Sequence, residues 1–308
     1  MNILNIGSLN IDYVYEVSHF VRPGESINAE KIIQNSGGKG LNQSVAMSKA
    51  GLSVSHAGFV GEADGDFLIR ALQENKVDTG LIEKIDLPSG NAVIQVVPSG
   101  ENCIIVYNGA NKQLTEAYID TVLSRFSPGD YCVLQNEINR VPEIIRRAHQ
   151  KGLKVILNPS PIDSELLSAD FSDIDLMILN EIEGRQITGR TDPDEIIRSL
   201  LERSPDTRYV LTLGQDGAVY ADRDRRLKCG IYPAEVVDTT AAGDTFTGYF
   251  IYSIVHQLPV ADGLRIASAA SAVAVSRNGA AQSIPYRREV LEYIEAYGGL
   301  DIVESAGG

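Results

Sequence analysis

Strand-like and helix-like segments alternate along most of this chain, and that alternation constrains the fold more than any other feature. Strands joined by helices need crossover connections, which are right-handed and make the strands parallel. We therefore predict an α/β fold, with a doubly wound, mainly parallel sheet flanked by helices in a single domain over residues 1–308. Hydrophobic patterning places strands at 3–6, 54–60, 131–135, 155–157, 177–179 and 209–213, and helices at 64–75, 115–125, 141–151 and 194–203.

Polar residues follow several of the predicted strands at the point where each strand ends. In open α/β sheets, ligands bind beyond the carboxyl ends of the strands. Asn10 and Asp12 come just after the strand at 3–6, although an Asx turn would account for them equally well. As a series, these residues predict a ligand cleft along one edge of the sheet that includes Asn10, Asp12, Glu137, Asn158, Asn180, Glu183 and Thr212.

Two segments, at about 13–35 and 91–107, have the pattern of β hairpins instead. In the first, Tyr13, Tyr15 and Val17 alternate ahead of a Pro23-Gly24 turn and a strand predicted at 27–33. The second repeats this pattern around a Pro-Ser-Gly-Glu turn. We expect the two hairpins to pair into a small antiparallel β sheet that serves as a lid, as a homodimer surface, or as both.

A glycine-rich stretch, Ser36-Gly37-Gly38-Lys39-Gly40-Leu41-Asn42, lies ahead of a helix predicted to begin at its last residue. Its glycines permit close approach of a ligand to the backbone. The stretch is no Walker loop, because that pattern has four residues between its first two glycines and Ser or Thr after the lysine. Simple helix capping is the alternative reading of these glycines.

The most informative run is 236–248, where a β-type segment closed by Val236 and Val237 gives way to a helix from about Gly243. The small residues before that helix leave backbone N–H groups bare, and a helix N-terminus attracts anions. Asp244 in the first turn could take a proton from an attacking hydroxyl. These features suggest phosphoryl transfer, while an aspartate that merely stabilises a helix start explains them about equally well.

The amino-acid composition limits the classes of partner that this protein is expected to bind. With 27 Lys and Arg against 41 Asp and Glu, the formal net charge of −14 argues against nucleic-acid and anionic-membrane surfaces, which need basic patches. The three cysteines have no metal-ligand spacing, and the N-terminus has no signal-peptide pattern. No dinucleotide-binding Gly-x-Gly-x-x-Gly turn follows the first strand. We expect a cytoplasmic protein that binds small molecules.

Five blocks occur in an order that resembles the PfkB-type carbohydrate kinases, and most closely their ribokinase branch, over essentially the whole chain. Two blocks match the signature patterns of that family, namely 37–42 and 238–244. The other three lie at 7–12, 180–183 and 212–217. The resemblance implies a ribokinase-like fold with a β lid, and an enzyme that uses ATP and Mg²⁺ to phosphorylate a small sugar.

The resemblance further implies transfer of the γ-phosphoryl group to the 5-hydroxyl of D-ribose. Asp244 would be the base, and the Ala242 and Gly243 N–H groups would form the anion hole. Alternatives are a kinase for another sugar or a nucleoside, such as deoxyribose, a fructose derivative or an adenosine-like compound, or a catalytically silent sugar-binding protein of the same fold. The silent alternative is disfavoured because Asp244, Asn180 and Glu183 are all present.

Ligand roles also follow from the resemblance. Positions that match sugar ligands are Asn10, Asp12, Gly38, Lys39, Asn42 and Glu137. Positions that match the nucleotide and magnesium site are Asn180, Glu183, Thr212, Gly214, Gly217, Gly243 and Ser268. Positions that match a K⁺ site beside the anion hole are Asp238, Thr240, Ala274, Arg277, Gly279 and Ser283, where simple loop packing is the alternative.

Three residues depart from the family pattern. Leu41 and Asn136 stand where other residue types are usual, and they could reshape the sugar pocket. Ser268 replaces a histidine near the adenine. A change of one methylene shifts discrimination by only about 1–3 kcal/mol, so related pentoses and nucleosides stay open.

Overall fold

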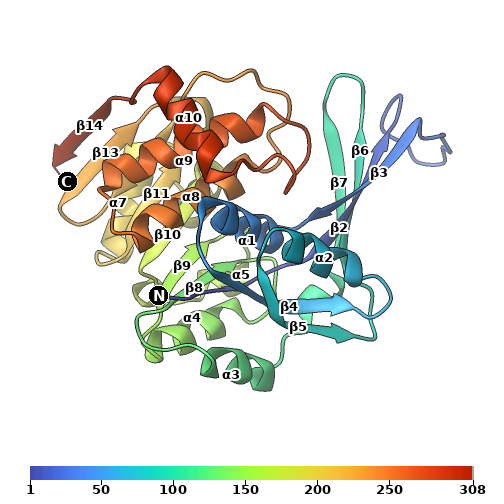
Figure 1. Ribbon diagram of the computed structural model, residues 1–308, viewed down its shortest axis with the longest axis horizontal. Coiled ribbons are helices and arrows are strands. Elements are labelled where there is room, and N and C mark those ends of the chain that lie inside the picture. The colour runs from blue at the N-terminus through green and yellow to red at the C-terminus, as the bar shows by residue number, and fades with distance from the viewer. Residues whose placement is uncertain (307–308) are drawn as a thin grey trace.

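The computed structural model describes residues 1–306, and its largest element is a ten-stranded sheet with helices on both faces (Figure 1). Across the sheet the strands follow in the order β14 (Ile302–Ala306), β13 (Arg225–Cys229), β12 (Ala218–Ala221), β11 (Arg208–Thr212), β10 (Leu176–Asn180), β9 (Lys154–Asn158), β8 (Tyr131–Gln135), β1 (Ile3–Ile6), β4 (Val54–Gly61) and β5 (Asp78–Ile85). Neighbouring strands from β5 to β11 are parallel, and β12 to β14 extend one edge in antiparallel fashion. The predicted doubly wound α/β fold is confirmed.

Two layers of helices bury the two faces of the main sheet. One layer consists of α1 (Lys39–Ala50), α2 (Asp66–Glu74), α8 (Ala242–Val255), α9 (Val260–Val275) and α10 (Arg287–Tyr297). The other consists of α3 (Glu116–Ser124), α4 (Val141–Gln150), α5 (Ser164–Leu167), α6 (Glu181–Thr188) and α7 (Pro193–Arg203). Because side chains alternate along a strand, Ile3 of β1 contributes to the first core and Leu4 to the second.

Helix α7 forms where apolar residues recur at helical spacing behind a capped start. In α7 the apolar residues 196, 197, 200 and 201 are buried on one side. The side chain of Asp192 accepts the N–H groups of Asp194 and Glu195, and Pro193 occupies the first helical position, where a missing N–H costs nothing. The prediction of a helix at 194–203 is therefore confirmed within one residue of its start.

Two local predictions about the signature motifs were wrong. Helix α1 begins at Lys39, three residues before the predicted start at Asn42, because Gly38 adopts φ 90° and turns the chain there. No strand ends at Val236 and Val237, which are 62% and 49% exposed and lie in an irregular segment that leads into α8. Apolar residue type alone suggested a strand, but no neighbouring strand is available to pair with this segment.

The two hairpins form a separate four-stranded sheet that projects from the helical layers (Figure 1). Strands β2 (Asn10–Glu16) and β3 (Lys31–Gly37) pair antiparallel, as do β6 (Gly90–Val96) and β7 (Asn102–Tyr107). The two pairs join through a parallel contact between β2 and β6. The second strand of the first hairpin was predicted at 27–33, and Asn10 and Asp12 were expected after a strand. Instead, β3 starts at Lys31, and both polar residues lie within β2.

Candidate active site

The start of α8 presents open hydrogen-bond donors. No side chain caps this helix at Ala241. Within residues 1–306, the backbone N–H groups of Gly243 and Asp244 have no backbone acceptor, while that of Ala242 donates to the carbonyl of Thr239 at 3.2 Å. A side chain at Gly243 would meet open space. The first turn of α8 therefore offers donors and room for an anion, and Ala242 is the less available of the two predicted donors.

The carboxylate of Asp244 lies in this first turn and is only 7% exposed. Asn42 donates its side-chain N–H to Oδ2 at 3.0 Å, and Gln43 donates to Oδ1 at 2.9 Å. Burial raises the pKa of Asp244, and the nearby ammonium of Lys39 and the two amides oppose that increase. A carboxylate that is buried yet held by donors has the properties of a general base.

The glycine-rich turn clamps the start of α1 against the ends of two strands of the main sheet. A side chain at Gly40 would approach the backbone N of Ser8 to 2.3 Å, so only glycine fits there. The hydroxyl of Ser8 and the backbone N–H of Lys39 both donate to Glu137 Oε2, the latter at 2.9 Å. Glu137 thus occupies the N-terminus of α1, where a negative charge is favourable.

The lid contributes two polar residues from β2. Burial and the neighbouring Glu137 raise the pKa of Asp12 to about 7. Asn10 is buried, and its Oδ1 accepts a hydrogen bond from Asn111 at 2.7 Å. Asn111 also accepts the backbone N–H of Leu9 at 2.9 Å, so it fixes Asn10 from outside the lid. Sequence reasoning missed Asn111, because no motif surrounds it and its contacts lie about a hundred residues away along the chain.

Lys39 is the cation shared by these acidic groups. Burial lowers the pKa of its ammonium, but the carboxylates of Asp244, Glu137 and Glu183 outweigh that effect and raise it. Residues predicted from separate motifs are therefore brought together electrostatically around one lysine. The structure places Glu137 and Glu183 just beyond the carboxyl ends of β8 and β10, and Lys39 and Asp244 at the starts of α1 and α8.

The predicted nucleotide residues lie along the same end of the sheet. Asn180 and Glu183 form a reciprocal capping box at the start of α6: the backbone N–H of Asn180 donates to Glu183 Oε2 at 2.9 Å, and that of Glu183 donates to Asn180 Oδ1 at 2.9 Å. Thr212 ends β11, next to Asn180 in the register of the sheet. Gly214 and Gly217 follow with φ of 54° and 90°, values that favour glycine.

The remaining predicted nucleotide residue is Ser268. It is buried in α9, and its hydroxyl donates to the carbonyl of Gly230 at 3.2 Å. Among residues 1–306, no group of three or more His, Cys, Asp or Glu side chains is arranged to hold a metal ion. A magnesium ion would therefore need oxygen ligands from nucleotide and water in addition to Glu183.

The predicted K⁺ residues come from two loops that are held together. Asp238 Oδ1 accepts the N–H of Thr240 at 2.9 Å, and Oδ2 accepts the N–H of Gly279 at 2.9 Å. The side chain of Arg277 forms an ion pair with Glu289 at 2.6 Å. This leaves the backbone of Arg277 as the part that could contribute to a cation site. The backbone N–H of Arg277 donates to the carbonyl of Ala274 at 3.1 Å. Ser283 is buried and bonded to the carbonyl of Ala280. Carboxylate, hydroxyl and carbonyl oxygens are suitable ligands for a hard cation.

Two of the residues that depart from the family pattern have buried side chains. Leu41 is fully buried in the core between α1, α8 and the main sheet. Asn136 is 3% exposed, and its amide donates to the carbonyl of Pro161 at 2.6 Å. In this structure, neither side chain is accessible to a ligand.

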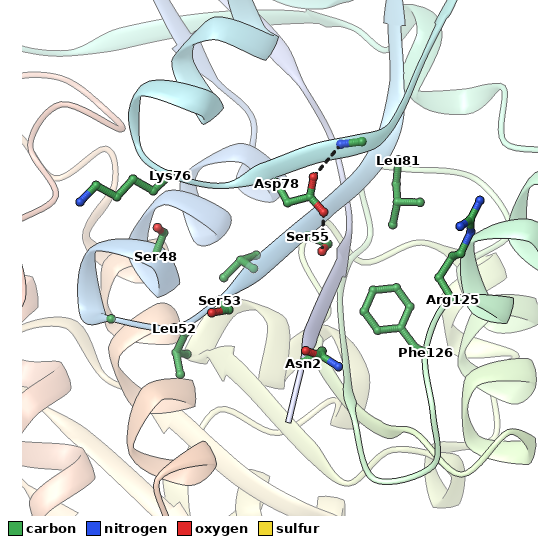
Figure 2. A pocket seen from close by; sticks show the side chains of 13 residues that line it. Asn2, Ser48, Leu52, Ser53, Ser55, Lys76, Asp78, Leu81, Arg125 and Phe126 are labelled. Carbon is green, nitrogen blue, oxygen red and sulfur yellow. Dashed lines mark hydrogen bonds between the residues drawn. The ribbon is translucent and has the colours of Figure 1, made fainter.

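A large depression lies at the opposite, amino end of the parallel strands. It has a volume of about 910 Å³ and is bordered by the residues shown in Figure 2, among them Lys76, Asp78 and Arg125. Asp78 bonds to the hydroxyl of Ser55 at 3.0 Å and to the backbone N–H of Gly80 at 3.0 Å. Its charged side chains are exposed, and none of the predicted site residues borders it.

No helix within residues 1–306 is both long and apolar enough to cross a membrane.

Comparison with known proteins identifies the family. Residues 2–287 match the model of the pfkB family carbohydrate kinases. The chain is 32% identical over 301 residues to the ribokinase of Haemophilus influenzae, covering 94% of this chain and 97% of that protein. It is 30% identical over 302 residues to the deoxyribokinase of Salmonella typhi, covering 96% of this chain and 99% of that protein.

A solved structure of Arabidopsis thaliana ribokinase, complexed with ribose and ATP, superposes with a TM-score of 0.84 at 28% identity. The match covers 95% of this chain and 98% of that one. Matches of sequence and of fold therefore extend over nearly the same length of chain. This chain belongs to the pfkB family of carbohydrate kinases and is a sugar phosphotransferase that uses ATP.

Proposed function

We propose that this protein transfers the γ-phosphoryl group of ATP to the 5-hydroxyl of D-ribose and releases ribose 5-phosphate. The observation that carries the proposal is the position of Asp244, whose buried carboxylate lies in the same helical turn as the open N–H group of Gly243. A hydroxyl bound at this turn gives its proton to Asp244, while the transferring phosphoryl group faces the donors of Gly243 and Ala242. Similarity to ribokinases over nearly the whole chain supports ribose as the acceptor.

The sugar hydroxyls are held by residues from the lid and from the start of α1. Asp12 and Glu137 accept hydrogen bonds, Lys39 donates them, and the amides of Asn10 and Asn42 do both. Because Gly38 has no side chain, the sugar can approach its backbone closely. These contacts fix the sugar so that the hydroxyl that attacks lies beside Asp244, and such positioning accounts for much of the rate in phosphoryl transfer.

ATP is proposed to bind along the ends of β10 and β11, at Thr212, Gly214 and Gly217, with its base near Ser268. Both oxygens of Glu183 already accept hydrogen bonds from Asn180, at 2.9 and 3.0 Å. We therefore assign Asn180 and Glu183 to magnesium through water molecules, because Mg²⁺ gives up its hydration shell reluctantly. Magnesium, when bound, neutralises the charge that develops on the phosphates.

We also propose a K⁺ site, formed by Asp238, Thr240, Ala274, Arg277, Gly279 and Ser283. Its support is the oxygen-rich pair of loops joined through Asp238, which lie next to the start of α8. A cation held there would organise the segment that leads into the anion hole.

A substrate panel tests the proposal. ATP turnover is measured with D-ribose, 2-deoxyribose, fructose derivatives and nucleosides at matched concentrations. We expect ribose to give the highest kcat/KM and the product to carry its phosphate on the 5-oxygen, as read by ³¹P–¹H NMR. Deoxyribose is the second candidate, because the Salmonella deoxyribokinase is 30% identical over nearly the same length. A higher kcat/KM for another acceptor would replace ribose, and no turnover with any acceptor would favour a silent binding protein.

A homodimer through the lid is a separate proposal. All residues of β7 are exposed, including Ile104, Ile105 and Val106 at 51%, 65% and 55%. An exposed apolar strand at a sheet edge is uncommon in a monomer and invites pairing with a second copy. We expect sedimentation to show a dimer at micromolar concentration and Ile105→Lys to shift it toward a monomer. A wild-type monomer under the same conditions would refute the dimer.

A further inference from the structure

We propose that Gln43 is a positioning residue for Asp244, and that its amide N–H holds the carboxylate in the orientation needed to accept the substrate proton. This inference rests on the proposed function, because it takes Asp244 as the base. Gln43 directly follows Asn42 in α1, yet it has none of the exposure of a ligand residue, since it is 0% accessible. A buried primary amide without hydrogen bonds would cost roughly 1–3 kcal/mol, so its partners explain its presence.

The side chain of Gln43 has a hydrogen-bond partner on each side. Its Nε2 donates to Asp244 Oδ1 at 2.9 Å and to Asn158 Oδ1 at 3.2 Å. Its Oε1 accepts from Gln135 Nε2 at 2.7 Å. Both N–H groups and the carbonyl oxygen of the Gln43 amide therefore have partners. These partners come from the ends of β8 and β9 and from the start of α8. The direction of each bond decides what Gln43 does for Asp244.

On the Gln135 side of Gln43, a backbone carbonyl determines the direction of the hydrogen bonds. Asn5 donates its side-chain N–H to the carbonyl of Gly40 at 2.8 Å, and a carbonyl can only accept, so the nitrogen of Asn5 is identified. Asn5 Oδ1 must then accept from Gln135 Nε2, at 3.1 Å. The second N–H of Gln135 donates to the oxygen of Gln43. The nitrogen of Gln43 is left facing Asp244.

A second backbone carbonyl independently determines the same orientation of the Gln43 amide. Asn158 donates its N–H to the carbonyl of Ile178 at 2.8 Å, so its Oδ1 faces Gln43 and requires a donor there. If the Gln43 amide were flipped, its oxygen would face the carboxylate of Asp244. Its N–H group would then face the N–H group of Gln135. Such a flip would create repulsion on both sides, so the network fixes the amide in one orientation.

Gln43 and Asn42 therefore have different tasks at the same carboxylate. Asn42 donates to Oδ2 and is also proposed to contact the sugar, so its bond to Asp244 is exchangeable on binding. Gln43 lies beneath Asp244 and cannot be reached by substrate, so its bond to Oδ1 persists. Burial and the carboxylate of Glu137 raise the pKa of Asp244, and the ammonium of Lys39 and the two amides oppose this increase. Loss of the Gln43 donor should raise that pKa further and leave the carboxylate free to rotate.

The test uses two variants of Gln43 in the full-length enzyme, assayed with ATP and ribose. Gln43→Glu keeps the length of the side chain and the acceptor for Gln135, but replaces the donor facing Asp244 with an oxygen. Gln43→Leu removes both. We expect kcat to fall about tenfold or more in each, since a positioned base contributes roughly 10²–10⁴-fold, with little change in the KM of the sugar. The acidic limb of the kcat–pH profile should move to higher pH, because the base then ionises less readily.

Gln73→Glu is the matched control, because Gln73 is an exposed residue of α2, and it should behave as wild type. A folded Gln43→Glu protein with wild-type kcat and pH profile would overturn the proposal. So would a lower melting temperature with neither kinetic change, since that indicates a purely structural role. If neither variant folds, ¹⁵N NMR of the wild type decides: the Gln43 side-chain amide should exchange slowly with solvent, and fast exchange contradicts the network.

The two proposals fail in different ways. A wild-type protein that phosphorylates no acceptor, or an Asp244→Asn variant with wild-type turnover, refutes the proposed function. A wild type that turns over ribose, with an inactive Asp244→Asn variant and an unaffected Gln43→Glu variant, refutes only the role of Gln43.

Discussion

The two ends of the parallel strands both carry charged and polar side chains, but they organise them differently. At the amino end, Lys76, Asp78 and Arg125 border a depression of about 910 Å³ and remain exposed (Figure 2). Within residues 1–306, neither of the two cations there takes part in an ion pair. At the carboxyl end, Lys39 is partly buried, and the carboxylates of Asp244, Glu137 and Glu183 raise the pKa of its ammonium. The hollow is therefore lined by exposed charges, whereas the predicted site residues Asn42, Glu183 and Asp244 are buried.

The two ends differ because their charged groups are exposed to solvent to different degrees. Exposed charges are screened by water and attract one another weakly, by at most about 1 kcal/mol for an exposed pair. Buried charges have pKa values that depend on their neighbours, as Asp12 and Asp244 illustrate. Five experiments, from the largest expected effect to the smallest, can break or sharpen this comparison between the two ends.

The largest effect is expected for Asp244→Asn. The amide cannot accept the proton of the substrate hydroxyl, so kcat should fall about 10²–10⁴-fold, with a smaller change in the KM of the sugar. Steady-state kinetics measure both. The matched change at the other end, Asp78→Asn, should leave kcat and KM near wild type. Equal loss in both variants would mean that the enzyme is sensitive to any change of charge, and not to a base at Asp244.

The second effect concerns sugar binding through Asp12. Loss of a hydrogen bond to a charged acceptor is worth about 1.5–3 kcal/mol, so Asp12→Asn should raise the KM of the sugar roughly tenfold or more. Its kcat should change less than that of Asp244→Asn. If KM is unchanged, Asp12 does not contact the sugar.

Asp12 also predicts a pH dependence of stability. Its pKa is about 7 in the folded protein and near its ordinary value of 3.8 when unfolded, so the folded state binds more protons between these values. The free energy of unfolding of the ligand-free protein should therefore fall as pH rises from about 4 to 7. Urea melts across this range measure the slope, and Asp12→Asn should flatten it. An identical slope in the variant would contradict the shift.

A smaller effect is expected from the monovalent cation. Replacing Na⁺ with K⁺ at constant ionic strength should increase kcat severalfold, because the loops at Asp238 and Gly279 offer oxygen ligands beside the anion hole. Equal rates in the two salts would rule out the K⁺ site. The double variant Lys76→Gln/Arg125→Gln serves as the test at the amino end, and it should respond to K⁺ as wild type does.

The smallest effect is expected for that double variant itself. Its kcat and KM should lie within about twofold of wild type, since exposed charges contribute little. A large loss of activity would assign the amino-end depression a function and would break the comparison between the two ends.

The sequence by itself determined the repeating features of this protein. The alternation of strands and helices predicted the doubly wound sheet, and helical spacing located α7 to within one residue. Local patterns marked Asp244 at a helix start, and Asn180 and Glu183 just after a predicted strand, because both features depend on near neighbours in the sequence. The resemblance of ordered blocks to a kinase family supplied the ligand roles, which remain predictions.

Only the tertiary structure decided which residues meet. Gln43 lies beside Asp244, 201 positions along the chain, and Asn111 lies beside Asn10, 101 positions away. No local pattern encodes such pairs, because they depend on strand order and on which face of a helix turns inward. The same reason explains the wrong strand at Val236 and Val237, whose residue type favoured a strand while the fold offered no partner. Distant contacts, and not local propensity, set the orientation of the Asp244 carboxylate.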